Sequence, residues 1–151
     1  MSILIEELRL LVDSFNRNGI DFALCGGLAV AAHGLVRATL DIDFLIREET
    51  LDEAYKAAAK VGYDIRGLDI SFKERTVEIR RVSKIVGEDV ISLDLLLVTP
   101  HVENVWQTRE SIEFMGQQLF VVSRAGLIEM KRQAGRLQDL ADIDRLENET
   151  S

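Results

Sequence analysis

The chain has 151 residues and a mass of 17.0 kDa, a size that supports one hydrophobic core and excludes a large multidomain assembly. Hydrophobic residues make up 47% and charged residues 29% of the sequence, which excludes intrinsic disorder. The net charge of −8 argues against unspecific adhesion to nucleic acid or to an anionic membrane. We therefore expect a single folded domain over residues 1–151.

Apolar segments and cysteine content bear on the cellular compartment. No stretch reaches the roughly 18 uncharged apolar residues of a membrane span, and residues 1–7 lack the basic start and cleavage site of a signal peptide. Cys25 is the only cysteine, which excludes an internal disulfide and a cysteine-rich zinc site. The expectation is a cytoplasmic protein with no membrane partner.

Helical and strand signals alternate along the first part of the chain. Apolar residues first recur at helical spacing, and Asn18-Gly19 ends this pattern because glycine readily adopts the left-handed conformation of a helix end. A short apolar run then leads through Gly26-Gly27 into an alanine-rich segment. The predicted elements, in order, are a helix over 3–18, a strand over 20–25, a helix over 28–35, a strand over 39–46 and a helix over 48–61.

The rest of the chain is richer in strand signals. Thr99 and Pro100 are typical of a helix start, Gly116 of a hairpin turn, and Ser123 of a helix cap. The predicted elements are short strands or a hairpin over 63–85, a strand over 90–98, a helix from 100 to about 110, a strand pair over 112–122, and helices over 123–133 and 137–146. Strands mixed with helices indicate an α/β or α+β domain with one sheet covered by helices.

Three aspartates are the strongest candidates for chemistry. Asp41 and Asp43 lie two residues apart in a predicted strand, so both carboxylates project from one face and repel each other. Asp94 lies in the apolar strand over 90–98, where an unpaired charge would be costly to bury. Together they would form an oxygen-rich site suited to Mg²⁺, and two such ions about 4 Å apart could assist an in-line phosphoryl displacement.

Gly26-Gly27 adds a second feature to this pattern. Backbone amides without side chains at a helix start can approach a phosphate closely. Each motif also has an ordinary structural interpretation, since the aspartates could lie on a solvated strand edge and the glycines could form a plain tight turn. A phosphate-binding turn and a carboxylate site joined by one helix is more specific than either motif alone.

The segment from Cys25 to Phe44, CGGLAVAAHGLVRATLDIDF, resembles the signature of the DNA polymerase beta-like nucleotidyltransferase superfamily. It most resembles the small bacterial branch related to abortive-infection (AbiEii-type) toxin nucleotidyltransferases. The resemblance implies a minimal nucleotidyltransferase fold, with a mixed central sheet flanked by helices. It also implies that Gly26 and Gly27 hold the nucleotide phosphates, while the catalytic metal ligands for two Mg²⁺ ions are Asp41, Asp43 and Asp94.

Basic residues could complete a nucleotide site. Lys131, on a late helix that this fold brings near the site, is a candidate cation for the triphosphate, with a plain surface lysine as the alternative. Arg37 and Thr39 lie on the approach to the aspartates, where Arg37 could face the phosphates or shield the acidic cluster. The basic clusters over 73–75 and 80–84 are interpreted as solvated surface charge.

Other reactive residue types are given structural interpretations. His33 is expected to pack or to cap its helix, Cys25 to be inert core, and Trp106 to lie on a buried helix face. Arg136 and Asp139 are expected to form a structural pair between the last helices.

The sequence thus predicts a Mg²⁺-dependent nucleotidyltransferase. It would transfer a nucleoside monophosphate from a nucleoside triphosphate such as ATP to a hydroxyl of RNA, protein or a small molecule, with release of pyrophosphate. The alternative is a non-catalytic or partner-dependent nucleotide-binding module, such as one component of a toxin-antitoxin pair. A homodimer or a protein partner is compatible with either function.

Overall fold

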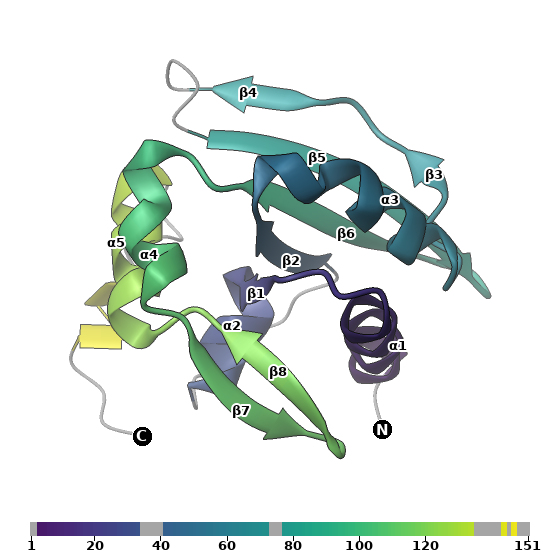
Figure 1. Cartoon of the computed structure of the whole chain (residues 1–151), viewed down its shortest axis with the longest axis horizontal. Coiled ribbons are helices and arrows are strands. Elements are labelled where there is room, and N and C mark those ends of the chain that lie inside the picture. Colours follow the sequence, from purple (N-terminus) through teal and green to yellow (C-terminus); the bar gives the residue numbers. More distant parts are fainter. Residues whose placement is uncertain (1–2, 34–40, 73–76, 135–142, 145, 148–151) are drawn as a thin grey trace.

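The computed structural model describes residues 3–33, 41–72, 77–134, 143–144 and 146–147, and these form a mixed eight-stranded sheet with helices packed against it (Figure 1). The strands are β1 (Ala23–Cys25), β2 (Asp41–Ile46), β3 (Ile65–Arg66), β4 (Ile70–Phe72), β5 (Val77–Val86), β6 (Asp89–Leu97), β7 (Glu110–Phe114) and β8 (Gln117–Val121). Their order across the sheet is β3-β5-β6-β2-β1-β8-β7, with β4 also paired to β5. This arrangement confirms the expected fold class.

The helices lie on both faces of the sheet. They are α1 (Ile3–Arg17), α2 (Gly26–Ala32), α3 (Leu51–Ala59), α4 (Glu103–Gln107) and α5 (Arg124–Ala134), with short 3₁₀ segments η1 (Glu48–Thr50) and η2 (Pro100–Val102). The first and third helices contact each other, and the Ser14 hydroxyl of α1 donates to the Ala57 carbonyl of α3 at 2.7 Å. The second helix contacts β2 and α5.

Three phenylalanines join α1 to the middle of the sheet. The rings of Phe15 and Phe44 meet edge to face with centroids 5.1 Å apart, and Phe22 stacks on Phe44 at 4.5 Å. All three side chains are fully buried, so each contributes roughly 2–3 kcal/mol through removal of apolar surface from water. This contact fixes β2, and with it the two aspartates, against the core.

The longest pairing in the sheet is the β5–β6 hairpin, in which β6 matches the strand expected over 90–98 and β5 lies in the segment expected to form short strands or a hairpin. Its turn consists of Gly87 and Glu88, and Gly87 has a φ of +63°, which favours glycine. The pairing begins with Val86 opposite Asp89 and continues without interruption to Ile79 opposite Leu96. The hairpin therefore sets which side chains of β5 stand beside those of β6.

The element boundaries confirm most of the expected pattern and correct two parts of it. The second helix begins directly at Gly26, and the helix expected from residue 100 to about 110 is a 3₁₀ turn plus the short α4, with Glu110 already in β7. Ser123 does cap α5, because its Oγ accepts the Gly126 N–H at 3.0 Å. The helix expected over 137–146 lies almost entirely outside the described residues. Among the helices described, none is long and apolar enough to cross a membrane.

Candidate active site

The three aspartates lie on neighbouring strands in register. Asp43 of β2 stands directly beside Asp94 of β6 in the parallel pairing, and Asp41 lies two residues before Asp43. Because alternate residues of a strand share a face, all three side chains project from the same side of the sheet. The expected juxtaposition of the carboxylates is therefore present, whereas their chemical role remains a prediction.

An arginine that the sequence interpretation missed holds two of these carboxylates. Arg81 of β5 stands opposite Asp94, and its Nε and Nη2 donate to the two Asp94 carboxylate oxygens at 2.7 and 2.9 Å. Its Nη2 also lies 3.6 Å from Asp41 Oδ2. The interpretation of the 80–84 cluster as solvated surface charge is therefore wrong for Arg81. It is also wrong for Lys84, which pairs with the buried Glu7 at 2.8 Å.

The carboxyl of Asp43 has a raised pKa. Burial raises its pKa to about 7, and the neighbouring charges of Asp94 and Asp41 act in the same direction. Arg81 and Lys131 partly offset this rise, since a nearby cation favours the ionised carboxylate. The positive charge of Arg81 and Lys131 is thus too small to restore the ordinary pKa of Asp43.

Gly26 has a steric role next to Asp43. A Cβ atom at Gly26 would lie 2.1 Å from Asp43 Oδ2, and the φ of +67° at Gly26 is one that other residues rarely adopt. The glycine therefore leaves room for the carboxylate whether or not it binds a phosphate. Gly27 is buried in the first turn of α2. Phosphate binding by either glycine remains a prediction.

Lys131 is a buried residue of α5, only 6% exposed, so the alternative of a plain surface lysine is wrong. Its charge lowers the pKa of Asp43 and that of Cys25, which places its ammonium group within electrostatic reach of both. The Cys25 thiol is fully buried and its pKa is raised by burial, as expected for inert core. Whether Lys131 binds phosphate is untested.

The remaining predicted residues fall into two groups. Arg37, Thr39, Arg136 and Asp139 lie outside the described residues. His33 packs as expected, with its ring Nε2 3.1 Å from the Val122 carbonyl oxygen and its own carbonyl accepting from Arg124. Trp106 is 4% exposed and belongs to the core.

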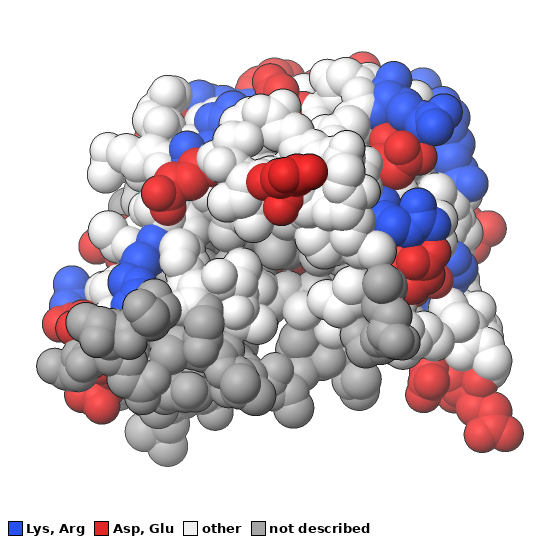
Figure 2. Space-filling view, turned by 90° about the horizontal axis from the view of Figure 1, so that it is seen from below, with Lys and Arg blue, Asp and Glu red and all other residues white. Residues whose placement is uncertain are grey.

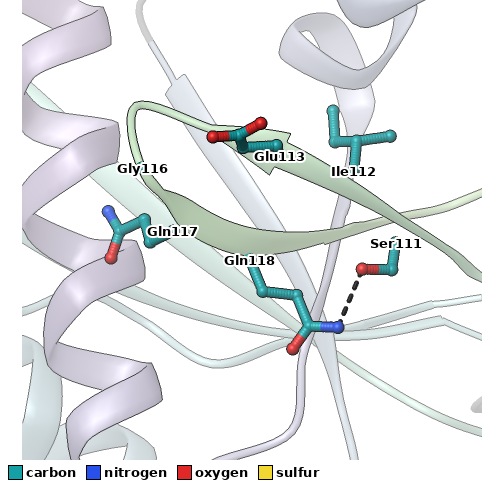
Figure 3. Close-up of a pocket in the computed structure, with 6 residues that line it drawn as sticks. All are labelled: Ser111, Ile112, Glu113, Gly116, Gln117 and Gln118. Atoms are coloured by element: carbon teal, nitrogen blue, oxygen red, sulfur yellow. Dashed lines mark hydrogen bonds between the residues drawn. The ribbon is translucent and has the colours of Figure 1, made fainter.

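A depression on the β7–β8 hairpin lies apart from the aspartates (Figure 3). It has a volume of about 390 Å³, and its residues are Ser111, Ile112, Glu113, Gly116, Gln117 and Gln118. The Gln118 side-chain amide donates to the Ser111 hydroxyl at 2.8 Å, so these two polar groups satisfy each other. None of the predicted site residues lines this depression.

The donor chemistry of the aspartate cluster suits a hard cation. Asp41, Asp43 and Asp94 offer only carboxylate oxygens, and Asp43 lacks full compensation of its charge. Within the described ranges, however, no three acidic, histidine or cysteine side chains converge as a ready-made metal site. Both Asp94 oxygens accept from Arg81. A metal would therefore fit these residues only after Asp94 exchanges its arginine partner.

Comparison with solved structures identifies the class of fold. A candidate nucleotidyltransferase from Thermotoga maritima superimposes with a TM-score of 0.67 and 15% identity, covering 96% of this chain and 92% of that one. The lincosamide antibiotic adenylyltransferase LnuA, bound to lincomycin, gives a TM-score of 0.61 and 15% identity, covering 95% and 96%. The aminoglycoside enzyme ANT(2")-Ia, in complex with adenylyl-2"-tobramycin, gives 0.61 and 10%, covering 96% and 88%.

These similarities show that the chain has the fold of the nucleotidyltransferases. No protein-family model matches the sequence, and no curated protein sequence matches it. At 10–15% identity the likeness concerns the fold. The more specific resemblance to the AbiEii-type branch stays a prediction.

Proposed function

We propose that the protein is a nucleotidyltransferase that transfers a nucleoside monophosphate from a nucleoside triphosphate to a hydroxyl group. One observation carries the proposal: a nucleotidyltransferase fold places Asp43 in register with Asp94, and Asp41 on the same face. Two carboxylates held side by side in a sheet repel each other, so such a cluster implies a cationic ligand. A metal-bound triphosphate is a ligand of that kind.

The reaction requires few groups from the protein. The acceptor oxygen forms a bond to the α-phosphorus, and the bond from this phosphorus to the oxygen leading to the β-phosphate breaks. Pyrophosphate leaves with that electron pair, and Asp94 assists removal of the hydroxyl proton. Two Mg²⁺ ions held by Asp41, Asp43 and Asp94 would supply charge neutralisation at the phosphates. Gly26, Gly27, Arg37, Thr39 and Lys131 would orient the triphosphate.

Small molecules are the acceptors to examine first. One structural neighbour of nearly the same extent holds lincomycin, and another holds an adenylylated tobramycin. The face in Figure 2 shows acidic and basic side chains side by side along its right margin and an acidic side chain among uncharged ones in the upper middle. The described residues of that face show no continuous basic surface for a nucleic acid, and the net charge of the chain is −8.

The test is a transfer assay. Purified protein is incubated with Mg²⁺, each of the four α-³²P-labelled nucleoside triphosphates and an acceptor panel of aminoglycosides, lincosamides, transfer RNA and the protein itself. Asp43→Asn should lower labelling by at least about 100-fold, because loss of a supporting group near a metal already costs 10–100-fold. Asp52→Asn, at an exposed site on α3, is the matched control and should label normally. Undiminished labelling by Asp43→Asn would exclude the proposal.

The same geometry also favours one alternative. Arg81 neutralises Asp94 and lies close to Asp41, so these carboxylates have a structural partner without any metal. A regulatory, nucleotide-binding module of a toxin-antitoxin pair would not need a catalytic metal, and Arg81 alone would neutralise Asp94 in it. Binding of a nucleotide without label transfer, together with a co-purifying protein, would identify this alternative.

A further inference from the structure

We propose that Arg81 is a built-in counter-cation, which holds Asp94 and Asp41 in place of a divalent metal and must be displaced before the metal binds. This inference rests on the proposed function and adds a positioning residue to it. It starts from the geometry of the pair, in which both Asp94 oxygens accept hydrogen bonds from one guanidinium, at 2.7 and 2.9 Å.

The burial of the two partners differs, and this difference makes the exchange feasible. The Asp94 side chain is 10% exposed, whereas that of Arg81 is 41% exposed. Arg81 can therefore move its guanidinium into water at little cost, while Asp94 must keep a cationic partner wherever Arg81 goes. A divalent ion at the carboxylates is such a partner.

The charge balance of the cluster points to the same exchange. Arg81 carries one positive charge and faces Asp94 and Asp41 directly, with Asp43 within electrostatic reach. The two-point contact of Arg81 uses the lone pairs of both Asp94 oxygens that face the guanidinium, and a metal bound on that side would need the same lone pairs, so the two cations compete for one carboxylate. The competition should weaken the binding of free metal by about tenfold, within the usual range of coupling between two ligands.

The adjacent arginine provides a matched control. Arg80 points to the other face of β5, where it lies 3.3 Å from Glu78 and 3.5 Å from Asp69. Its side chain is 18% exposed, and its partners are not the three aspartates of the site. Replacing Arg80 or Arg81 with glutamine changes the net charge equally, so any difference between the two variants reports position rather than overall charge.

The experiment measures binding of Mn²⁺ alone, from the electron paramagnetic resonance signal of the unbound ion, for wild type, Arg81→Gln, Arg81→Lys and Arg80→Gln. We expect Arg81→Gln to bind Mn²⁺ about tenfold more tightly than wild type, Arg81→Lys to lie between them because lysine cannot form the paired contact, and Arg80→Gln to match wild type. Circular dichroism checks that each variant is folded. Arg81→Lys keeps the test valid should Arg81→Gln unfold.

Two results would overturn the inference, and they differ in what else they exclude. If wild type and the folded Arg81 variants bind Mn²⁺ equally, or wild type binds it more tightly, Arg81 does not compete with the metal, although the metal site and the proposed function stand. If no variant binds Mn²⁺, with or without ATP, the proposed function fails together with the inference.

Discussion

Two clusters of charged side chains in this protein each contain a basic residue of β5, and they differ in the ratio of basic to acidic groups. In the first, buried Glu7 of α1 accepts from Lys84 Nζ at 2.8 Å and from the Tyr63 hydroxyl at 3.0 Å. In the second, Arg81 faces Asp94 and Asp41, and Asp43 adds a third carboxylate. The first cluster has one cation for one carboxylate, whereas the second has more acidic groups than Arg81 can satisfy.

The difference separates a structural cluster from a binding site. A buried carboxylate with a matched cation and a hydroxyl donor is satisfied in the folded protein and needs no ligand. Excess carboxylates cost free energy, and this cost is recovered when a cation binds. Three kinds of substitution test this distinction: one fills the space beside Asp43, one removes the cation beside Glu7, and one removes the charge of Asp43.

The largest loss of stability should come from a side chain that fills the space beside Asp43. Gly26→Ala would place a methyl group 2.1 Å from Asp43 Oδ2 and force an alanine to a φ of +67°, so we expect a loss of about 3–4 kcal/mol in the free energy of unfolding. Gly87→Ala is the matched control, with a φ of +63° and no atom within 4 Å, and should cost about 1 kcal/mol. Urea unfolding measures both, and equal losses would contradict the steric role of Gly26.

A smaller loss should follow from removing the cation of the structural cluster. Lys84→Met leaves Glu7 buried without its ammonium partner, and we expect it to lower the free energy of unfolding by about 2–3 kcal/mol, reduced from the fully buried case because Lys84 is 22% exposed. Adding Glu7→Gln removes the unpaired charge and keeps an acceptor for Tyr63, so the double variant should recover most of the loss. A double variant as unstable as Lys84→Met would show that packing of the lysine, not its charge, stabilises the cluster.

The smallest effect concerns the charge of Asp43 and depends on pH. Its pKa of about 7 in the folded protein exceeds the ordinary value of 3.8, so between these values the unfolded chain releases a proton that the folded protein retains. Raising the pH through this window therefore lowers the stability of wild type, whereas Asp43→Asn lacks this titration. In the presence of a chelator, the variant should gain on the order of 2 kcal/mol over wild type between pH 5 and pH 7.

Urea unfolding at the two pH values measures this difference. Added Mg²⁺ should reduce it at pH 7, because a bound cation favours the ionised Asp43. A constant difference between Asp43→Asn and wild type at all pH values would contradict the raised pKa.

The sequence allowed the aspartates, but not their arginine partner, to be predicted. Asp41 and Asp43 follow the period of a strand, and the apolar run around Asp94 indicates a second, buried strand, so local patterns find the three groups. The place of Asp94 on a strand beside the other two was implied by the nucleotidyltransferase resemblance. The tandem Arg80-Arg81 is polar in sequence and suggests surface charge. Pairing between β5 and β6, which local composition does not encode, decides that Arg81 meets Asp94, whereas Arg80 on the other face meets Glu78 of its own strand.

The sequence of the β5–β6 turn nevertheless contains the information that places Arg81 opposite Asp94. A two-residue hairpin turn at Gly87-Glu88 fixes Val86 opposite Asp89, and counting back equally along both strands brings Arg81 to Asp94. Identifying the turn would have required joining the end of the segment over 63–85 to the strand over 90–98 as one hairpin. The burial of Lys131 could not be found in this way, since it depends on how α5 packs near the sheet.

The paired arginines also determine which register errors the hairpin can tolerate. If β5 slipped by one residue so that each position took its preceding neighbour, Arg80 would replace Arg81 opposite Asp94, and a guanidinium would still neutralise that carboxylate. The same slip would put Ser83 in the place of Lys84 and leave Glu7 without its cation. The slip would also place Arg81 instead of the buried Val82 opposite Leu93, on the core face of the sheet. Core packing and the contact of β5 with α1, rather than the pairing of an arginine with Asp94, therefore discriminate the correct alignment from its nearest competitor.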